Sequence, residues 1–285
     1  MFAHQVIETL LNNKHLSSLN PDKRIIFAES ISLAPKFHFG EEEGLINAIP
    51  HAEEYPFFYG SWRKNINPPY PLVWFDCVSK DKVVSKLGFL ICFFKNNMLK
   101  IYPFVCSRND SRWYPDLIAY VIDLDEDGRD GYGYEKNDLL DFSKIDIPFN
   151  DKDIIRKYAA RGMGSITGIS NFCLMLLNCK NITTETIQPP EKLNIKRRKN
   201  NKQELFEYHV LNVVLPSKKQ GYREKTDPNY HVRVHLCRGH FKEYTQEHPL
   251  FGSLTGRYWW QPHVRGQNHD GIVMKDYEVK QAIAV

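Results

Sequence analysis

The run "LVWFDCV" (72–78) decides the fold, because it opens a series of short segments rich in β-branched and aromatic residues, which are typical of β-strands. The segments that follow it are "KLGFLICFF" (86–94), "MLKIYPFVC" (98–106) and "DLIAYVIDL" (116–124). The "KNN" between Phe94 and Met98 favours a hairpin turn. The sequence therefore predicts an antiparallel meander of four strands over residues 72–124.

The aromatic side chains of these runs could form either a core or a binding face. Aromatic residues in strands usually pack against neighbouring elements. We therefore expect core positions for Trp74, Phe75, Phe89 and Phe93.

Helices are expected before and after the meander. Apolar residues at helical spacing predict a first helix near the N-terminus, and a second is expected to start near Pro21, since proline suits the first turn. Residues 151–181 also have a helical pattern, and their apolar second half predicts a buried helix. Residues 205–279 then return to β character.

This order of segments predicts an α+β fold: N-terminal helices, an antiparallel β meander, a central buried helix and, at the C-terminus, a second antiparallel sheet or small barrel. A proline break precedes a tract with six Lys/Arg and no acid between 192 and 202. We expect three parts: residues 1–188, a basic linker or arm at 189–204, and a C-terminal β-rich region at 205–285.

The composition is that of a soluble globular protein, with 285 residues, 42% hydrophobic and 25% charged content, and a net charge of +4. The longest apolar run, "GFLICFF" (88–94), is too short to cross a bilayer, and no secretory signal opens the chain. The six cysteines form no CxxC pair, which is typical of free thiols in a reducing cytosol. We expect a cytoplasmic protein without a membrane partner.

The segment "YHVRVHLCRGHFKEY" (230–244) concentrates histidine, arginine and lysine. If it is a strand, alternation places its valines and Leu236 on one face. The other face carries His231, Arg233, His235 and Cys237. This pattern fits the polar face of a half-buried strand, and it also fits a binding surface.

Nucleic-acid contact is the simplest functional interpretation of the C-terminal half. Arginine forks suit phosphates, and aromatic rings stack on unpaired bases. Because Trp259 and Trp260 are adjacent, they cannot face the same way in a strand, so one is expected in the core. The residues expected to bind nucleic acid are Arg197, Arg198, Arg233, Arg238, Lys242, Arg257, Trp259 and Arg265.

Cleavage of nucleic acid is a further hypothesis. Metal-independent phosphodiester cleavage needs an acid, a base and a cation for the developing charge. The elements "CRGH" (237–240) and "HVRG" (263–266) could supply His240 and His263 as the catalytic pair, with Arg238 and Arg265 on the phosphate. This requires that the two elements meet in space.

The sequence predicts no metal site and no cofactor. Along a strand, His231 and His235 would lie about 13 Å apart, too far to share one zinc ion. The acidic stretch starting at Asp123 resembles a calcium loop, but it carries Tyr134 where a bidentate glutamate belongs. No Walker loop, dinucleotide fingerprint, GxSxG elbow or HExxH helix is present.

Four segments resemble a group of uncharacterised proteins from bacteriophages and other mobile elements. They are "LLNCKNI" (176–182), "PPEKLNIKRRKNNKQELFEYHVLNV" (189–213), "VHLCRGHFKEYTQEHPLFGSLTGRYWWQPHVRG" (234–266) and "KDYEV" (275–279). The resemblance implies a phage or prophage origin and action inside a bacterial host cell. It brings no activity and no catalytic residues with it.

Three functions follow from these observations. The leading expectation is an accessory protein that binds or acts on nucleic acid through its C-terminal Arg/His/aromatic surface. The first alternative is an inhibitor that binds a host defence or regulatory protein, because interfaces also favour Tyr, Trp and Arg. The second is a toxin-like, metal-independent nuclease. The sequence leaves open whether the protein is an enzyme and what its oligomeric state is.

Overall fold

The structure, a computed structural model, describes residues 1–12, 16–41, 66–125, 131–145, 155–159, 166–214, 216 and 239–260, and the backbone alone of 233–237, 263–265 and 267–272. The helices are α1 (Ala3–Asn12), α2 (Pro21–Leu33), α6 (Gly168–Leu177) and α7 (Glu191–Lys199), with a short helix at 155–159 and a 3-10 turn, η3 (Phe142–Lys144). The strands are β1 (Lys36–Glu41), β2 (Leu72–Val78), β3 (Val84–Phe93), β4 (Met98–Ser107), β5 (Trp113–Pro115), β6 (Ile118–Asp123), β7 (Tyr132–Lys136), β8 (Ile182–Ile187), β9 (Tyr208–Val213), β10 (Arg233–Cys237), β11 (His240–Tyr244), β12 (Gly256–Trp260), β13 (His263–Arg265) and β14 (Gln267–Ile272).

Nine strands form one mixed sheet in the order β7-β6-β4-β3-β2-β1-β9-β8, with β5 paired to β4. The predicted meander is confirmed as its centre: β2, β3, β4 and β6 pair antiparallel in this order. The sheet is wider than predicted and mixed, because β1 runs parallel to both β2 and β9. The local pattern of "KFHFGE" (36–41) does not predict this pairing, since the partners of a parallel strand lie far away in the chain.

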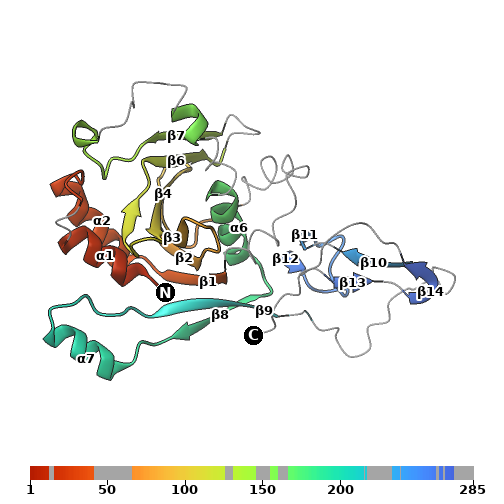
Figure 1. The fold of residues 1–285 in the computed structure, drawn as a ribbon. Helices are drawn as coiled ribbons and strands as arrows, with labels where there is room; N and C mark the ends of the chain where they lie inside the picture. The colour runs from red at the N-terminus through yellow and green to blue at the C-terminus, as the bar shows by residue number, and fades with distance from the viewer. Residues whose placement is uncertain are drawn as a thin grey trace.

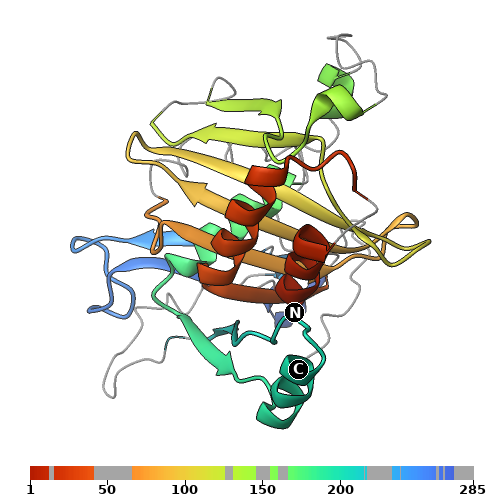
Figure 2. The ribbon, with the colours of Figure 1, turned by 90° about the vertical axis from the view of Figure 1, so that its left-hand side faces the viewer.

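Both faces of the central strands are buried. Helices α1 and α2 cover one face of the sheet and α6 covers the other (Figures 1 and 2). On β2, Trp74 belongs to the cluster under α1 and α2, whereas Phe75 belongs to the cluster under α6. This two-sided burial explains why "LVWFDCV" reads as an almost continuous apolar run. The predicted core positions of Trp74, Phe75 and Phe89 are confirmed, and Phe93 is partly buried.

The N-terminal and central helices agree with the prediction. Helix α2 starts at Pro21, and the Asn20 side chain accepts hydrogen bonds from the backbone N–H groups of Asp22 and Lys23. Helix α6 is the predicted buried helix, since it is enclosed along nearly its whole length.

The C-terminal strands do not form a barrel, which corrects one of the two predicted arrangements. β11 and β12 make a two-stranded antiparallel ladder, while β10 pairs antiparallel with β13 and parallel with β14. These ladders leave open edges in the part of the chain that the structure describes. We call β10–β13 the C-terminal ribbon.

The predicted basic linker or arm contains α7, which lies between β8 and β9 (Figure 1). β8 and β9 pair antiparallel at the edge of the nine-stranded sheet, so this stretch forms the connection at the end of a long hairpin of that sheet. The division into three parts stays a prediction. Among the described residues, no helix is long and apolar enough to span a membrane.

Candidate functional site

The basic tract forms a structured projection, which we call the α7 arm (residues 191–204). The Asn194 side chain donates to the backbone oxygen of Leu205 at 3.0 Å and accepts from its N–H at 2.8 Å. The Arg197 guanidinium donates to the backbone oxygen of Gln203 and to the Glu8 carboxylate on α1, both at 2.6 Å. These contacts fold the arm back on itself and fix it to α1.

The remaining cations of the α7 arm point to solvent. Arg198 is 53% exposed and pairs with Glu191 at 2.9 Å and Glu204 at 3.7 Å. The other exposed cations are Lys192, Lys196, Lys199 and Lys202. Of the two arginines predicted to bind nucleic acid here, Arg197 therefore holds the arm in place and Arg198 lies on its surface.

In the C-terminal ribbon, two of the predicted binding residues face inward. Trp259 is 3% exposed, and its ring packs against Phe172 of α6 with a centroid distance of 5.1 Å. Asn181 holds the same residue through two hydrogen bonds of 2.8 Å, one to its N–H and one to its backbone oxygen. Arg257 is 8% exposed and its Nε lies 3.2 Å from the Glu243 carboxylate.

Other ribbon residues are exposed. His240 and Lys242 both face solvent, and the Lys242 ammonium lies 4.8 Å from the centre of the Tyr244 ring. This is cation–π geometry on the outer side of the ribbon. The side chains of Arg233, Arg238, His263 and Arg265 lie outside the described residues.

The backbone register relates the two histidines proposed as a catalytic pair. His240 pairs with Trp260, and Cys237 pairs with His263, so one register continues from the β11–β12 ladder into the β10–β13 ladder. The His263 position is thus three residues further along the ribbon than the His240 position, which is about 10 Å. The structure brings the two elements into one ribbon but not directly opposite each other.

The α7 arm and the C-terminal ribbon lie at opposite ends of the β8–β9 hairpin (Figure 1). Asn181, which holds Trp259, directly precedes β8, and α7 follows the far end of that strand. Six residues of strand span about 20 Å. The two regions therefore cannot share one small ligand, although one extended polymer could contact both.

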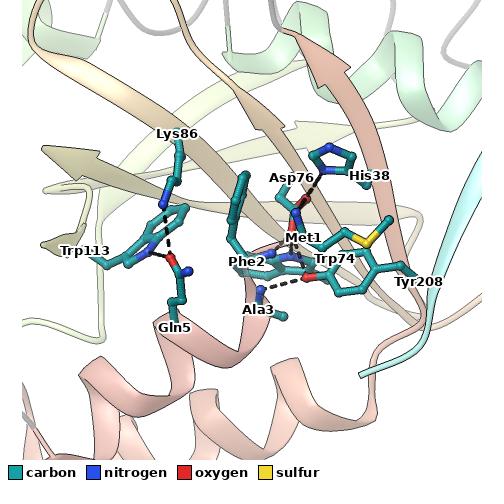
Figure 3. Close-up of polar contacts among 10 residues, drawn as sticks. All are labelled: Met1, Phe2, Ala3, Gln5, His38, Trp74, Asp76, Lys86, Trp113 and Tyr208. Carbon is teal, nitrogen blue, oxygen red and sulfur yellow. Dashed lines mark hydrogen bonds and ion pairs between the residues drawn. The ribbon is translucent and has the colours of Figure 1, made fainter. Parts of the chain in front are cut away.

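A buried carboxylate that the sequence reasoning missed lies on β2. The Asp76 side chain is 0% exposed and accepts hydrogen bonds from the Phe2 N–H at 2.7 Å, Trp74 Nε1 at 2.9 Å and the Tyr208 hydroxyl at 2.7 Å (Figure 3). Its other oxygen lies 2.6 Å from His38 Nδ1. A carboxylate inside an otherwise apolar strand was the signal in the sequence.

A close backbone approach supports the same cluster. A Cβ on Gly88, which pairs with Asp76 across β2–β3, would lie 2.5 Å from the Trp74 ring. Glycine therefore makes room for the indole that donates to Asp76. The glycine in "KLGFLICFF" is the matching signal in the sequence.

The surroundings of Asp76 favour its charged form. Burial acts to raise the pKa of Asp76, but the hydrogen bond from His38, the nearby α-amino group and the Trp74 indole together hold it below its ordinary value. The carboxylate also satisfies the Phe2 N–H at the start of α1, and Tyr208 accepts the Ala3 N–H at 2.7 Å. Asp76 thus ties α1, β1, β2 and β9 together, and His38 is held in one orientation.

Metal binding has no support in the described part of the chain. There, no three His, Cys, Asp or Glu side chains lie close enough together to hold an ion. No protein-family model, curated protein or solved structure matches the chain.

Proposed function

We propose that this chain is an accessory protein of a phage or mobile element that binds nucleic acid inside the bacterial cell, with the α7 arm as its main phosphate-contacting surface. The observation that carries the proposal is the set of exposed cations on a fixed arm. Four exposed lysines and Arg198 lie within eleven residues, and Arg198 pairs with Glu191 and Glu204. A basic surface of this kind attracts a polyanion.

The fixed conformation of the arm favours binding. Ordering a flexible, lysine-rich linker on a phosphate backbone would cost conformational entropy for every residue. Here Asn194 and Arg197 have already ordered the arm through their contacts with Leu205, Gln203 and Glu8. More of the electrostatic attraction therefore remains as net affinity.

The C-terminal ribbon is proposed as a second contact. Its outer side presents Lys242, Tyr244 and His240, a cation with aromatic neighbours that suits a phosphate and an unpaired base. In this proposal Trp259 and Arg257 act indirectly. Trp259 holds the ribbon against α6, and Arg257 pairs with Glu243 across β11 and β12.

The test is a binding titration with labelled single-stranded DNA, duplex DNA and RNA over a series of salt concentrations, with and without a chelator. We expect affinity to fall steeply with salt, because bound phosphates release counterions. Replacing Lys192, Lys196, Lys199 and Lys202 by glutamine should lower affinity about tenfold or more and reduce the logarithmic salt slope by about 3.

The matched control removes the same charge elsewhere. Lys82, Lys95, Arg156 and Lys157 are exposed and lie outside the α7 arm. Their replacement by glutamine should leave most of the affinity intact. Equal losses of affinity in the two variants would show that binding depends only on the net charge of the protein, and would overturn the role of the arm. Chelator-resistant cleavage in the same titration would support the nuclease hypothesis for His240 and His263.

A protein-binding function is the second candidate, and a different surface favours it. Helix α2 exposes an apolar stripe, Ile25, Ile26 and Leu33, and Leu33 is 79% exposed. Asp22 and Glu29 lie on the same face of the helix as these apolar residues, so this face fits a partner that offers both apolar and basic side chains. This function would be supported by a purified host protein that binds the wild-type chain and the exposed control Val83→Glu but does not bind Leu33→Glu.

A further inference from the structure

A surface cavity of about 330 Å³, largely open to solvent, lies between the end of α1 and the α7 arm. It is lined by Glu8, Leu11, Asn12, Arg198, Asn201, Lys202, Gln203 and Glu204. Its volume is at the lower end of the range of roughly 300–1,000 Å³ found for small-molecule sites. It borders the surface that we propose as the phosphate contact.

Ordered contacts build the walls of this cavity. Asn201 has a φ of 51°, and its N–H donates to the Arg198 backbone oxygen at 3.0 Å. This left-handed residue ends α7 and turns the chain back, so that residues 201–204 face α1. The Arg197–Glu8 ion pair fixes the two walls relative to each other. The cavity thus exists before any ligand arrives.

The lining has the chemistry of a nucleotide site. Arg198 and Lys202 suit a phosphate, whereas the carboxylates of Glu8 and Glu204 would repel a bare inorganic anion. The same carboxylates accept hydrogen bonds from the N–H groups of a base, and the three side-chain amides both donate and accept. Leu11, 44% exposed, adds an apolar surface for the ring.

We propose that this cavity takes one unpaired nucleotide of a bound strand, with its base among the amides and carboxylates and its phosphate on Arg198 and Lys202. The inference rests on the proposed nucleic-acid binding and specifies single strands as the preferred ligand. A base that is paired in a duplex cannot enter a cavity without unstacking, which costs a few kcal/mol. Single-stranded ligands should therefore bind more tightly than duplexes of equal length.

The deciding variant fills the cavity without changing its charge. Leu11→Trp places an indole in the lining, and Val83→Trp places one at an exposed position between β2 and β3, outside the α7 arm and away from the cavity. The probes are single-stranded and duplex DNA and RNA of one length, together with the free 5′-mononucleotides. Asn12→Leu, at the exposed end of α1, is a second variant if Leu11→Trp does not fold.

We expect Leu11→Trp to lower single-strand affinity about 5- to 150-fold, the value of one stacked base, and to leave duplex affinity unchanged. Val83→Trp should change neither affinity. Equal binding of single strands and duplexes, or no effect of the filled cavity, would overturn this inference while the role of the α7 arm stands. Failure of wild-type protein to bind any probe at low salt would overturn both.

Discussion

The α7 arm has six Lys/Arg and no aromatic residue, whereas the C-terminal ribbon has both basic and aromatic residues, and the structure uses these side chains differently. In the ribbon, Trp259 packs on α6 and Arg257 is buried, whereas Lys242 faces solvent. In the arm, Asn194 is buried and Arg197 is only partly exposed. The density of basic and aromatic residues therefore does not show which of these side chains are exposed. Their exposure depends on how the element lies relative to the core.

The largest expected effect tests the structural role of the ribbon. Trp259→Ala removes a ring that packs on Phe172 and Phe241, and it should lower the free energy of unfolding by about 3–5 kcal/mol. Chemical denaturation measures this. The neighbouring, less buried Trp260→Ala is the control, with a smaller expected loss. If Trp259→Ala left stability unchanged but abolished nucleic-acid binding, the ribbon would belong with the α7 arm as a contact surface.

The second prediction extends the comparison to the sheet. Asp76→Asn breaks a fully buried, charge-assisted cluster and should cost about 3 kcal/mol of stability, with Glu185→Gln on the exposed edge as a neutral control. Because the pKa of Asp76 is lowered in the fold, its contribution is complete above the unfolded pKa of about 4 and is lost as the pH falls through the lower folded value. Urea unfolding at pH 7 and pH 3 checks both points.

A wild-type protein whose stability did not fall below pH 4 relative to Asp76→Asn would contradict this account of the anchor. Gly88→Ala is an independent probe of the same cluster. The added methyl group would contact the Trp74 ring at 2.5 Å and displace the indole from Asp76. Overpacking of this kind costs typically 1–3 kcal/mol.

Much of the fold was predictable because it rests on local patterns. Four strands, the start of α2 at Pro21 and the buried α6 all follow from apolar periodicity and capping residues. The parallel pairing of β1 and the open C-terminal ladders depend on partners that are distant in sequence. Such pairings leave no local trace, so the sequence could not distinguish an open sheet from a barrel.

The candidate site was less predictable for a related reason. Adjacent Arg197 and Arg198 look alike in the basic tract, but only Arg197 has Glu8 of α1 within reach. That partner lies 189 residues away in the chain. Asp76 was visible as a carboxylate in an apolar strand, although its donors come from four separate segments. The sequence shows the type of each residue, but it does not show which residues contact it in the fold.

A third prediction concerns the joint between the α7 arm and α1. Burial, followed by the nearby Arg197 charge, lowers the pKa of His4 to about 4. The unfolded chain therefore binds more protons between about pH 6.5 and 4, so stability should decrease as the pH falls through this window. Since His4 is partly exposed, we expect a loss of about 1 kcal/mol between pH 7.5 and 5. His4→Gln should remove this loss, and the exposed His248→Gln should not.

The smallest expected effect on stability comes from the exposed lysines of the α7 arm, and it distinguishes the arm from the ribbon. Replacing the four exposed lysines of the α7 arm by glutamine should change the free energy of unfolding by no more than about 0.5 kcal/mol, because the contacts that hold the arm come from Asn194 and Arg197. Thermal unfolding, measured beside the binding titration, separates the two roles. A large loss of stability would make the lysines part of the fold, like Trp259. Unchanged stability with weakened binding would leave nucleic-acid contact as the reason for this charge.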